Sequence, residues 1–227
     1  MSAFLMKCNR IAVFLVGAIS VCFTIFAFFY AGILANVQTM QAERSFYFLV
    51  SNSAHVEVSA HTVRFQGGAG YFLDCDKGEY AAYAVYFSIG ESQTALQSLK
   101  SVEENVEIIE LKANPLYRKR GNAPSEEVKG AFNCLYAYMQ ILQNEISRLE
   151  KGATQESSRR ILGRLARQFS YLGEHNAKSV SGLENVCGYA QACLSEWIKD
   201  VIYVKDLRYL LCELSVAYVD LSENFLL

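Results

Sequence analysis

The sequence predicts an α+β protein with an N-terminal transmembrane helix, a domain of mixed strands and helices, and a C-terminal antiparallel bundle of helices. Three observations predict it: an uncharged apolar run near the N-terminus, aromatic and β-branched clusters broken by Gly and Asp in the middle, and helical periodicity in the last part. The predicted parts are a cytoplasmic N-terminus (1–10), a transmembrane helix (11–37), an α+β domain (45–112), a linker (113–124) and a helical domain (125–227).

The apolar run from 11 to 37 contains no charged residue. At about 1.5 Å of rise per residue it is long enough to cross a hydrocarbon core of roughly 30 Å. A cleaved signal peptide has a shorter apolar core, of roughly 7 to 15 residues, so we expect an uncleaved anchor in the lipid bilayer. Lys7 and Arg10 precede the run, whereas Arg44 after it is offset by Glu43. The positive-inside rule then predicts a single-pass cell-membrane protein with a cytoplasmic N-terminus and an extracytoplasmic soluble region.

Overall composition argues against several classes of function. The chain has 21 lysines and arginines against 23 aspartates and glutamates, so no broad basic field is available for nucleic acid. The soluble region has an odd number of cysteines and no CxxC pair, which indicates neither a disulfide framework nor a zinc site. We interpret these cysteines as small buried apolar residues: Cys75, Cys134, Cys187, Cys193 and Cys212.

No set of residues with catalytic spacing stands out. The three histidines are scattered, and the sequence contains no HExxH, GxSxG or phosphate-binding loop. Cys75 lies between Asp74 and Asp76, where a hairpin turn explains the two acids better than a nucleophilic site does. We therefore predict a protein that is not an enzyme and that needs no cofactor or metal.

The α+β domain is predicted from alternating strand-like and helix-like segments. Gly67 and Gly68 are suited to end the first helix with a left-handed cap. The order strand, helix, strand, strand, helix, strand is the split arrangement of ferredoxin-like domains. The predicted segments are a strand at 46–50, a helix at 54–65, a strand at 70–73, a turn at 76–78, a strand at 80–87, a helix at 91–100 and a strand at 106–111.

These segments carry a family resemblance. The run Gly67-Gly68-Ala69-Gly70-Tyr71, the strand from Tyr80 to Tyr86, and a helix opening near Ser92 with Ala95 and Leu99 are together similar to a SPOR-type (sporulation-related) repeat domain. The resemblance covers about residues 45 to 112. It implies two helices on one side of a four-stranded sheet, and binding of peptidoglycan glycan strands that lack stem peptides on the other side. Typical members carry a Gln and a Gly in or just after the first strand, and the stretch FYFLVSNS at 46–53 has neither.

Strand alternation places the candidate ligand-binding side chains on the sheet face away from the helices. Three of them are tyrosines, whose flat rings suit sugar stacking. Aromatic residues are also common in strands without any ligand, so an ordinary structural role stays open. The candidates are Tyr47, Leu49, Ser51, Tyr80 and Tyr86.

The C-terminal region is predicted to form amphipathic helices, because its apolar residues recur every three or four positions. Two or three helices cannot be told from four, because the helix breaks between 174 and 184 are soft. The linker holds both prolines and the basic cluster Arg118 to Arg120. We therefore expect the helical domain and the α+β domain to fold separately, with few contacts between them. The predicted helices are 126–149, 154 to about 173 or 175, about 181–201, and 204–225.

Two functions follow from these predictions. The first is a membrane-anchored cell-envelope protein that binds peptidoglycan glycan or a wall-associated partner in division or sporulation. The second is a non-catalytic scaffold whose SPOR-like domain no longer binds glycan and whose helical domain contacts another envelope protein. A polar, exposed sheet face around Tyr47 and Tyr86 would favour the first, and an exposed apolar stripe on the bundle would favour the second.

Overall fold

The computed structural model describes residues 44–52, 55–101, 103, 105–114 and 126–223, and residues from Glu43 onward form one compact unit. The predicted N-terminus (1–10) and transmembrane helix (11–37) lie outside the described residues. No helix within the described ranges is long and apolar enough to cross a membrane. The predicted fold class is therefore corrected: the described part is α+β, with six helices and a four-stranded antiparallel sheet, and it contains no membrane-spanning helix.

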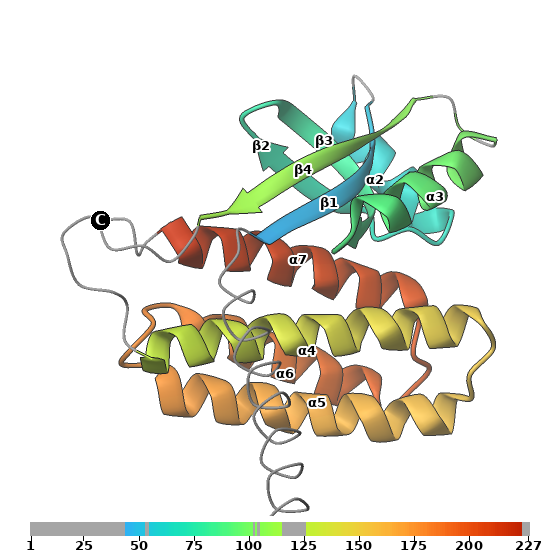
Figure 1. Cartoon of the computed structure of the whole chain (residues 1–227). Coiled ribbons are helices and arrows are strands. Elements are labelled where there is room, and N and C mark those ends of the chain that lie inside the picture. Colours follow the sequence, from blue (N-terminus) through green and yellow to red (C-terminus); the bar gives the residue numbers. More distant parts are fainter. Residues whose placement is uncertain (1–43, 53–54, 102, 104, 115–125, 224–227) are drawn as a thin grey trace, which may run out of the picture. The chain divides into compact units, whose positions relative to one another are not determined.

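The sheet has the strand order β2-β3-β1-β4, and each pair of neighbours is antiparallel. Helices α2 and α3 cover one face of it (Figure 1). The elements follow one another as two strand-helix-strand units, which is the order that the sequence pattern predicted. The bounds are β1 (Arg44–Ser51), α2 (Val56–Phe65), β2 (Tyr71–Cys75), β3 (Gly78–Tyr86), α3 (Ile89–Lys100) and β4 (Val106–Ala113).

Glycines shape the connection from α2 to β2. Gly67 and Gly70 have φ angles of 90° and 60°, in the left-handed region that glycine adopts without strain. A Cβ atom at Gly70 would lie only 2.6 Å from the carbonyl oxygen of Ala60. The loop is tied to β3 by the amide of Ala69, which donates to the carbonyl of Tyr83 at 2.7 Å. The Gly-rich run is therefore a tight, packed turn.

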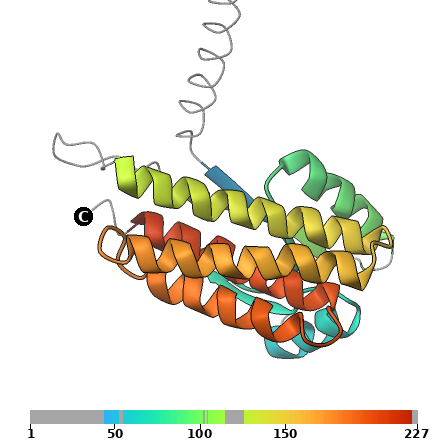
Figure 2. The ribbon, with the colours of Figure 1, turned by 90° about the horizontal axis from the view of Figure 1, so that it is seen from below.

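Four helices follow the sheet. Figure 1 shows α7 lying between the sheet and the other three, and Figure 2 shows α4, α5 and α6 running alongside one another with α7 behind them. The start of α5 is capped by Thr154, whose hydroxyl accepts a hydrogen bond from the amide of Ser157 at 3.3 Å. The bounds are α4 (Glu126–Glu150), α5 (Gln155–Asn176), α6 (Leu183–Trp197) and α7 (Val204–Glu223).

One core joins the sheet to the helical layer. Phe46, Phe48 and Val50 of β1 are fully buried, and they belong to the same apolar cluster as Leu210 and Leu214 of α7. A smaller cluster lies on the opposite face, beneath α2 and α3. The expectation of two separately folding units with few contacts is therefore wrong. The physical reason is that buried positions cover more than half of the circumference of α7, too much for a bundle alone to cover.

Polar contacts also connect the two layers. Arg64 of α2 forms an ion pair with Asp206 at the start of α7. The guanidinium of Arg44 donates to the side-chain oxygen of Asn133 in α4 at 2.7 Å. At the far end of α7, the hydroxyl of Ser222 accepts a hydrogen bond at 3.0 Å from the backbone amide of Asn114, the residue that follows β4. These contacts fix the position of the helices against the sheet.

We expect Leu214→Ala to destabilise the sheet and the helices together, by about 2 to 5 kcal/mol, because it leaves a cavity in the shared core. Unfolding in urea should be followed by the fluorescence of Trp197 in α6 and by hydrogen exchange of β1 amides, and the two midpoints should fall equally. Val201→Ala, at a side chain that is 47% exposed, is the control and should change stability by less than about 0.5 kcal/mol. Different midpoints for β1 and α6 would contradict a shared core.

Candidate functional site

The predicted ligand face is altered by a bulge in the sheet. Leu49 pairs with Ala84 but the next residue, Val50, pairs with Ala82, so Tyr83 is an extra residue in β3. Side-chain alternation along β3 is therefore interrupted, and residues before and after the bulge no longer share a face as simple alternation predicts. Tyr80 belongs to the core on the α7 side, whereas Tyr86 packs against the cluster beneath α2 and α3.

The five candidate residues do not form an exposed surface. Leu49, Ser51 and Tyr80 are 3%, 4% and 8% exposed, and Tyr47 and Tyr86 are half-buried. Tyr47 and Tyr86 are paired neighbours in β1 and β3, on the face that carries α2 and α3. The assumption that these side chains lie on the face away from the helices is wrong, because α7 covers that other face. The predicted platform of three tyrosines is not formed.

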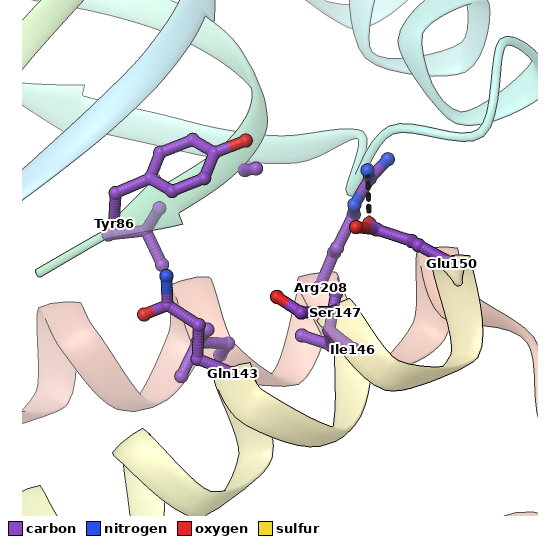
Figure 3. A pocket seen from close by; sticks show the side chains of 9 residues that line it. Tyr86, Gln143, Ile146, Ser147, Glu150 and Arg208 are labelled. Carbon is purple, nitrogen blue, oxygen red and sulfur yellow. Dashed lines mark hydrogen bonds and ion pairs between the residues drawn. The ribbon is translucent and has the colours of Figure 1, made fainter. Parts of the chain in front are cut away.

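Tyr86 instead lies beside a small hollow between β3, α4 and α7 (Figure 3). The pairing of β2 with β3 stops at Ala82, so the end of β3 has no strand beside it on this side among the described residues. The hollow has a volume of about 30 Å³, enough for a water molecule and far too little for a sugar. It is lined by Ala84, Val85, Tyr86, Gln143, Ile146, Ser147, Glu150, Arg208 and Leu211.

Arg208 is the central polar group of the hollow. One guanidinium nitrogen donates to the carbonyl of Gly67 at 2.7 Å, and another donates to Glu150 at 2.6 Å (Figure 3 draws the second contact). Arg208 therefore connects α7 to the α2–β2 loop and to α4. Because its charge is matched by the carboxylate of Glu150, little of it is left for an anionic ligand.

The remaining polar groups are neutral. Burial raises the pKa of the Tyr86 phenol, and Glu150 and Glu91 raise it further, while Arg208 acts in the opposite direction. The phenol therefore stays protonated. The amide nitrogen of Gln143 donates to Glu91 at 3.3 Å, and its buried oxygen has no hydrogen-bond partner among the described residues.

The geometry of the hollow does not fit catalysis. Ligand pockets usually have volumes of about 300 to 1,000 Å³, so a sugar ring does not fit here. Ser147 and Glu150 both line it, but the carboxylate of Glu150 is paired with Arg208, and no hydrogen bond joins it to the hydroxyl of Ser147 among the described residues. Across the part of the chain that the structure describes, no group of three or more His, Cys, Asp or Glu side chains is placed to hold a metal ion. We interpret the hollow as a structural junction.

The sequence prediction missed Arg208, Gln143 and Glu150, which belong to no motif. The one available signal was the position of Arg208 directly after Leu207 and shortly before Leu210, within the apolar stripe of a helix. A charged residue beside a buried stripe needs a partner, which Glu150 provides.

The outward face of α5 carries a row of exposed arginines. Arg160, Arg164 and Arg167 are exposed and follow one another at spacings of four and three residues, so they share one side of the helix. Arg160 pairs with Glu156. Within the described ranges no ion pair is formed by Arg164 or Arg167. One turn further, Tyr171 is also exposed.

The cysteines differ in burial. Cys187 and Cys212 are buried, Cys75 and Cys193 are half-buried, and Cys134 is exposed; all five are free thiols. Burial raises the pKa of Cys187 to about 12, and it raises the pKa of Cys212 as well. The interpretation as buried apolar residues therefore holds for two of the five and is wrong for Cys134.

Comparison with known proteins gives no relative: no protein-family model matches the chain, and neither the curated proteins nor the solved structures contain a significant match.

We expect Arg208→Met to lower the free energy of unfolding by about 1 to 3 kcal/mol, because the half-buried carbonyl of Gly67 loses its donor and Glu150 loses its partner. Chemical denaturation of both proteins measures it. Arg160→Met is the matched control, since it breaks a fully surface-exposed pair on α5 and should cost less than about 0.5 kcal/mol. Equal effects of the two substitutions would show that Arg208 does not tie the layers together.

Thiol labelling should follow the order of burial. With iodoacetamide at pH 8, Cys134 should react first among the five cysteines that the structure describes. Cys187 and Cys212 should stay unmodified until the chain is unfolded, because their thiolates are disfavoured and inaccessible. Peptide mass spectrometry over time gives the rates, and the chain in denaturant is the control. Rapid modification of Cys212 in the folded chain would contradict the placement of α7.

Proposed function

We propose that the chain is a non-catalytic assembly protein that acts through protein–protein contacts of its helical layer. The observation that carries this proposal is the position of α7, which covers the sheet face on which the SPOR resemblance implies glycan binding. With α2 and α3 on the other face, the sheet becomes an inner layer. What it offers to partners is limited to its edges and to the outer surfaces of the helices.

The energy of this contact argues against a removable cover. Leu207, Leu210 and Leu214 are fully buried and Leu211 is 2% exposed. Exposing four such leucines costs about 6 to 12 kcal/mol. A glycan bound with a dissociation constant of about 1 mM supplies only about 4 kcal/mol, which is less than this cost, so such a ligand does not displace α7. The sheet face therefore stays covered in the presence of glycan.

The outward face of α5 is the contact surface that we propose for a partner. Its arginines at 164 and 167 suit an acidic protein surface, since guanidinium groups bind carboxylates in a two-point geometry. Tyr171 adds an exposed ring, of a kind that is enriched in protein interfaces.

Binding of peptidoglycan glycan is the second candidate, and the element order of the sheet region is the observation that favours it. A site for it would have to lie away from the covered sheet faces. The predicted envelope location depends on residues 11–37, which lie outside the described residues, and it stays a prediction.

Two measurements separate these functions. The full chain should not co-sediment in a saturable way with sacculi stripped of stem peptides, and Tyr47→Ala/Tyr86→Ala should behave as the wild type does. A photo-crosslinking amino acid at position 167 should give a discrete protein adduct in cells, and Arg164→Glu should reduce it, because it reverses one charge of the contact.

The matched control is the same crosslinker at position 97, an exposed residue of α3 on the other side of the sheet. It should give no such adduct. Saturable binding to stripped sacculi that the double tyrosine variant abolishes would overturn the proposal. The proposal would also be overturned if no adduct formed at position 167, or if Arg164→Glu left the amount of adduct unchanged.

A further inference from the structure

The outer edge of β4 is a second surface with a specific geometry. Among the described residues, β4 pairs only with β1, so its other side is an edge of the sheet. All eight residues from Val106 to Ala113 pair with β1 without a register shift. Such an edge presents a row of backbone N–H and C=O groups that another strand can pair with. The other edge, β2, is shorter, with five residues.

The pairing with β1 assigns each side chain of β4 to a face. Glu110 lies opposite Tyr47, and Lys112 shares its face because side chains alternate along a strand. Ile109 and Leu111 lie opposite Phe48 and Phe46, on the face toward α7. The edge therefore carries one acid and one base on one face, and apolar side chains on the other.

We propose that β4 pairs antiparallel with β4 of a second copy of this chain, around a two-fold axis at Leu111, so that two sheets join into one. This inference deepens the proposed assembly function and rests on it. The axis is fixed by charge. Side chains that lie directly opposite in an antiparallel pair point to the same face, so the two-fold axis must pass through a residue that faces its own copy.

Only one nearby axis satisfies the charges. An axis at Glu110 brings two carboxylates together, and an axis at Lys112 brings two ammonium groups together. An axis at Ile109 sets Glu110 opposite Ile108. The axis at Leu111 places Glu110 opposite Lys112 of the second copy, twice by symmetry, and it also places Leu111 against itself and Ile109 against Ala113.

The consequence is a closed dimer. A two-fold interface uses the same edge of both copies, so once it forms the β4 edge is no longer available. The contact surface of α5 lies on the outer helical layer, away from the sheet edge (Figure 1). A dimer would present two copies of that surface, which raises the apparent affinity for a partner with repeated acidic sites.

Charge exchange tests the register. Sedimentation velocity of the purified full chain in a non-ionic detergent should show a dimer. Glu110→Lys and Lys112→Glu should each weaken dimerisation about tenfold or more, since each replaces two attractive pairs by two repulsive ones. The double variant Glu110→Lys/Lys112→Glu should dimerise as the wild type does. An equimolar mixture of the two single variants should form a mixed dimer, because every acid then meets a base.

The matched control is Glu107→Lys, on the other face of β4, which has no charged residue of the strand opposite it in this register and should leave the dimer intact. A monomeric wild type would overturn the inference, as would single variants that remain dimeric, or a double variant and a mixture that fail to dimerise. A monomeric chain that still gives the adduct at position 167 would overturn the dimer alone. A dimer without that adduct would overturn the α5 contact alone.

Discussion

The structure depends on the burial of α7 on two sides. Its leucines fill the space between the sheet and the other helices, and Phe46 and Phe48 of β1 meet it from the sheet side. Sheets with helices on one face usually leave the other face to solvent, to a second sheet or to a ligand. Here the chain supplies its own cover. A sheet domain and a helical bundle that would each be small thus become one folding unit with a common core.

Because helices cover both faces of the sheet, a binding surface on either face is not available. Tyr80 lies in the core on the α7 side, and Tyr47 and Tyr86 lie on the side of α2 and α3. The surfaces that stay accessible in the described part of the chain include the edge of β4 and the outward side of α5. Both are suited to protein contacts: an edge offers backbone groups in a fixed direction, and a row of arginines offers charge. The element order of the sheet region is therefore compatible with a ligand other than glycan.

The elements of the fold could be predicted from the sequence, and their packing could not. Periodicity located the last helix, but a pattern of apolar residues does not include the serines at 215 and 222. Both serines are buried. Their burial is tolerated because each hydroxyl donates a hydrogen bond within the same helix, to the carbonyl of Leu211 and of Val219 respectively. The second apolar side of α7 was hidden for this reason. The bulge at Tyr83 was hidden as well, since a pattern of period two does not show an inserted residue.

The hollow at Arg208 is best understood as a device that sets the position of α7. Leucines at 207, 210, 211 and 214 are similar enough that the helix could shift by a turn and still bury apolar surface. Arg208 reaches both Gly67 and Glu150, and only one position of α7 satisfies both contacts. Apolar burial alone specifies neither the register nor the angle of a helix, whereas a paired charge at its edge does. The strand β2 stops short of this point, which leaves the room that the guanidinium needs.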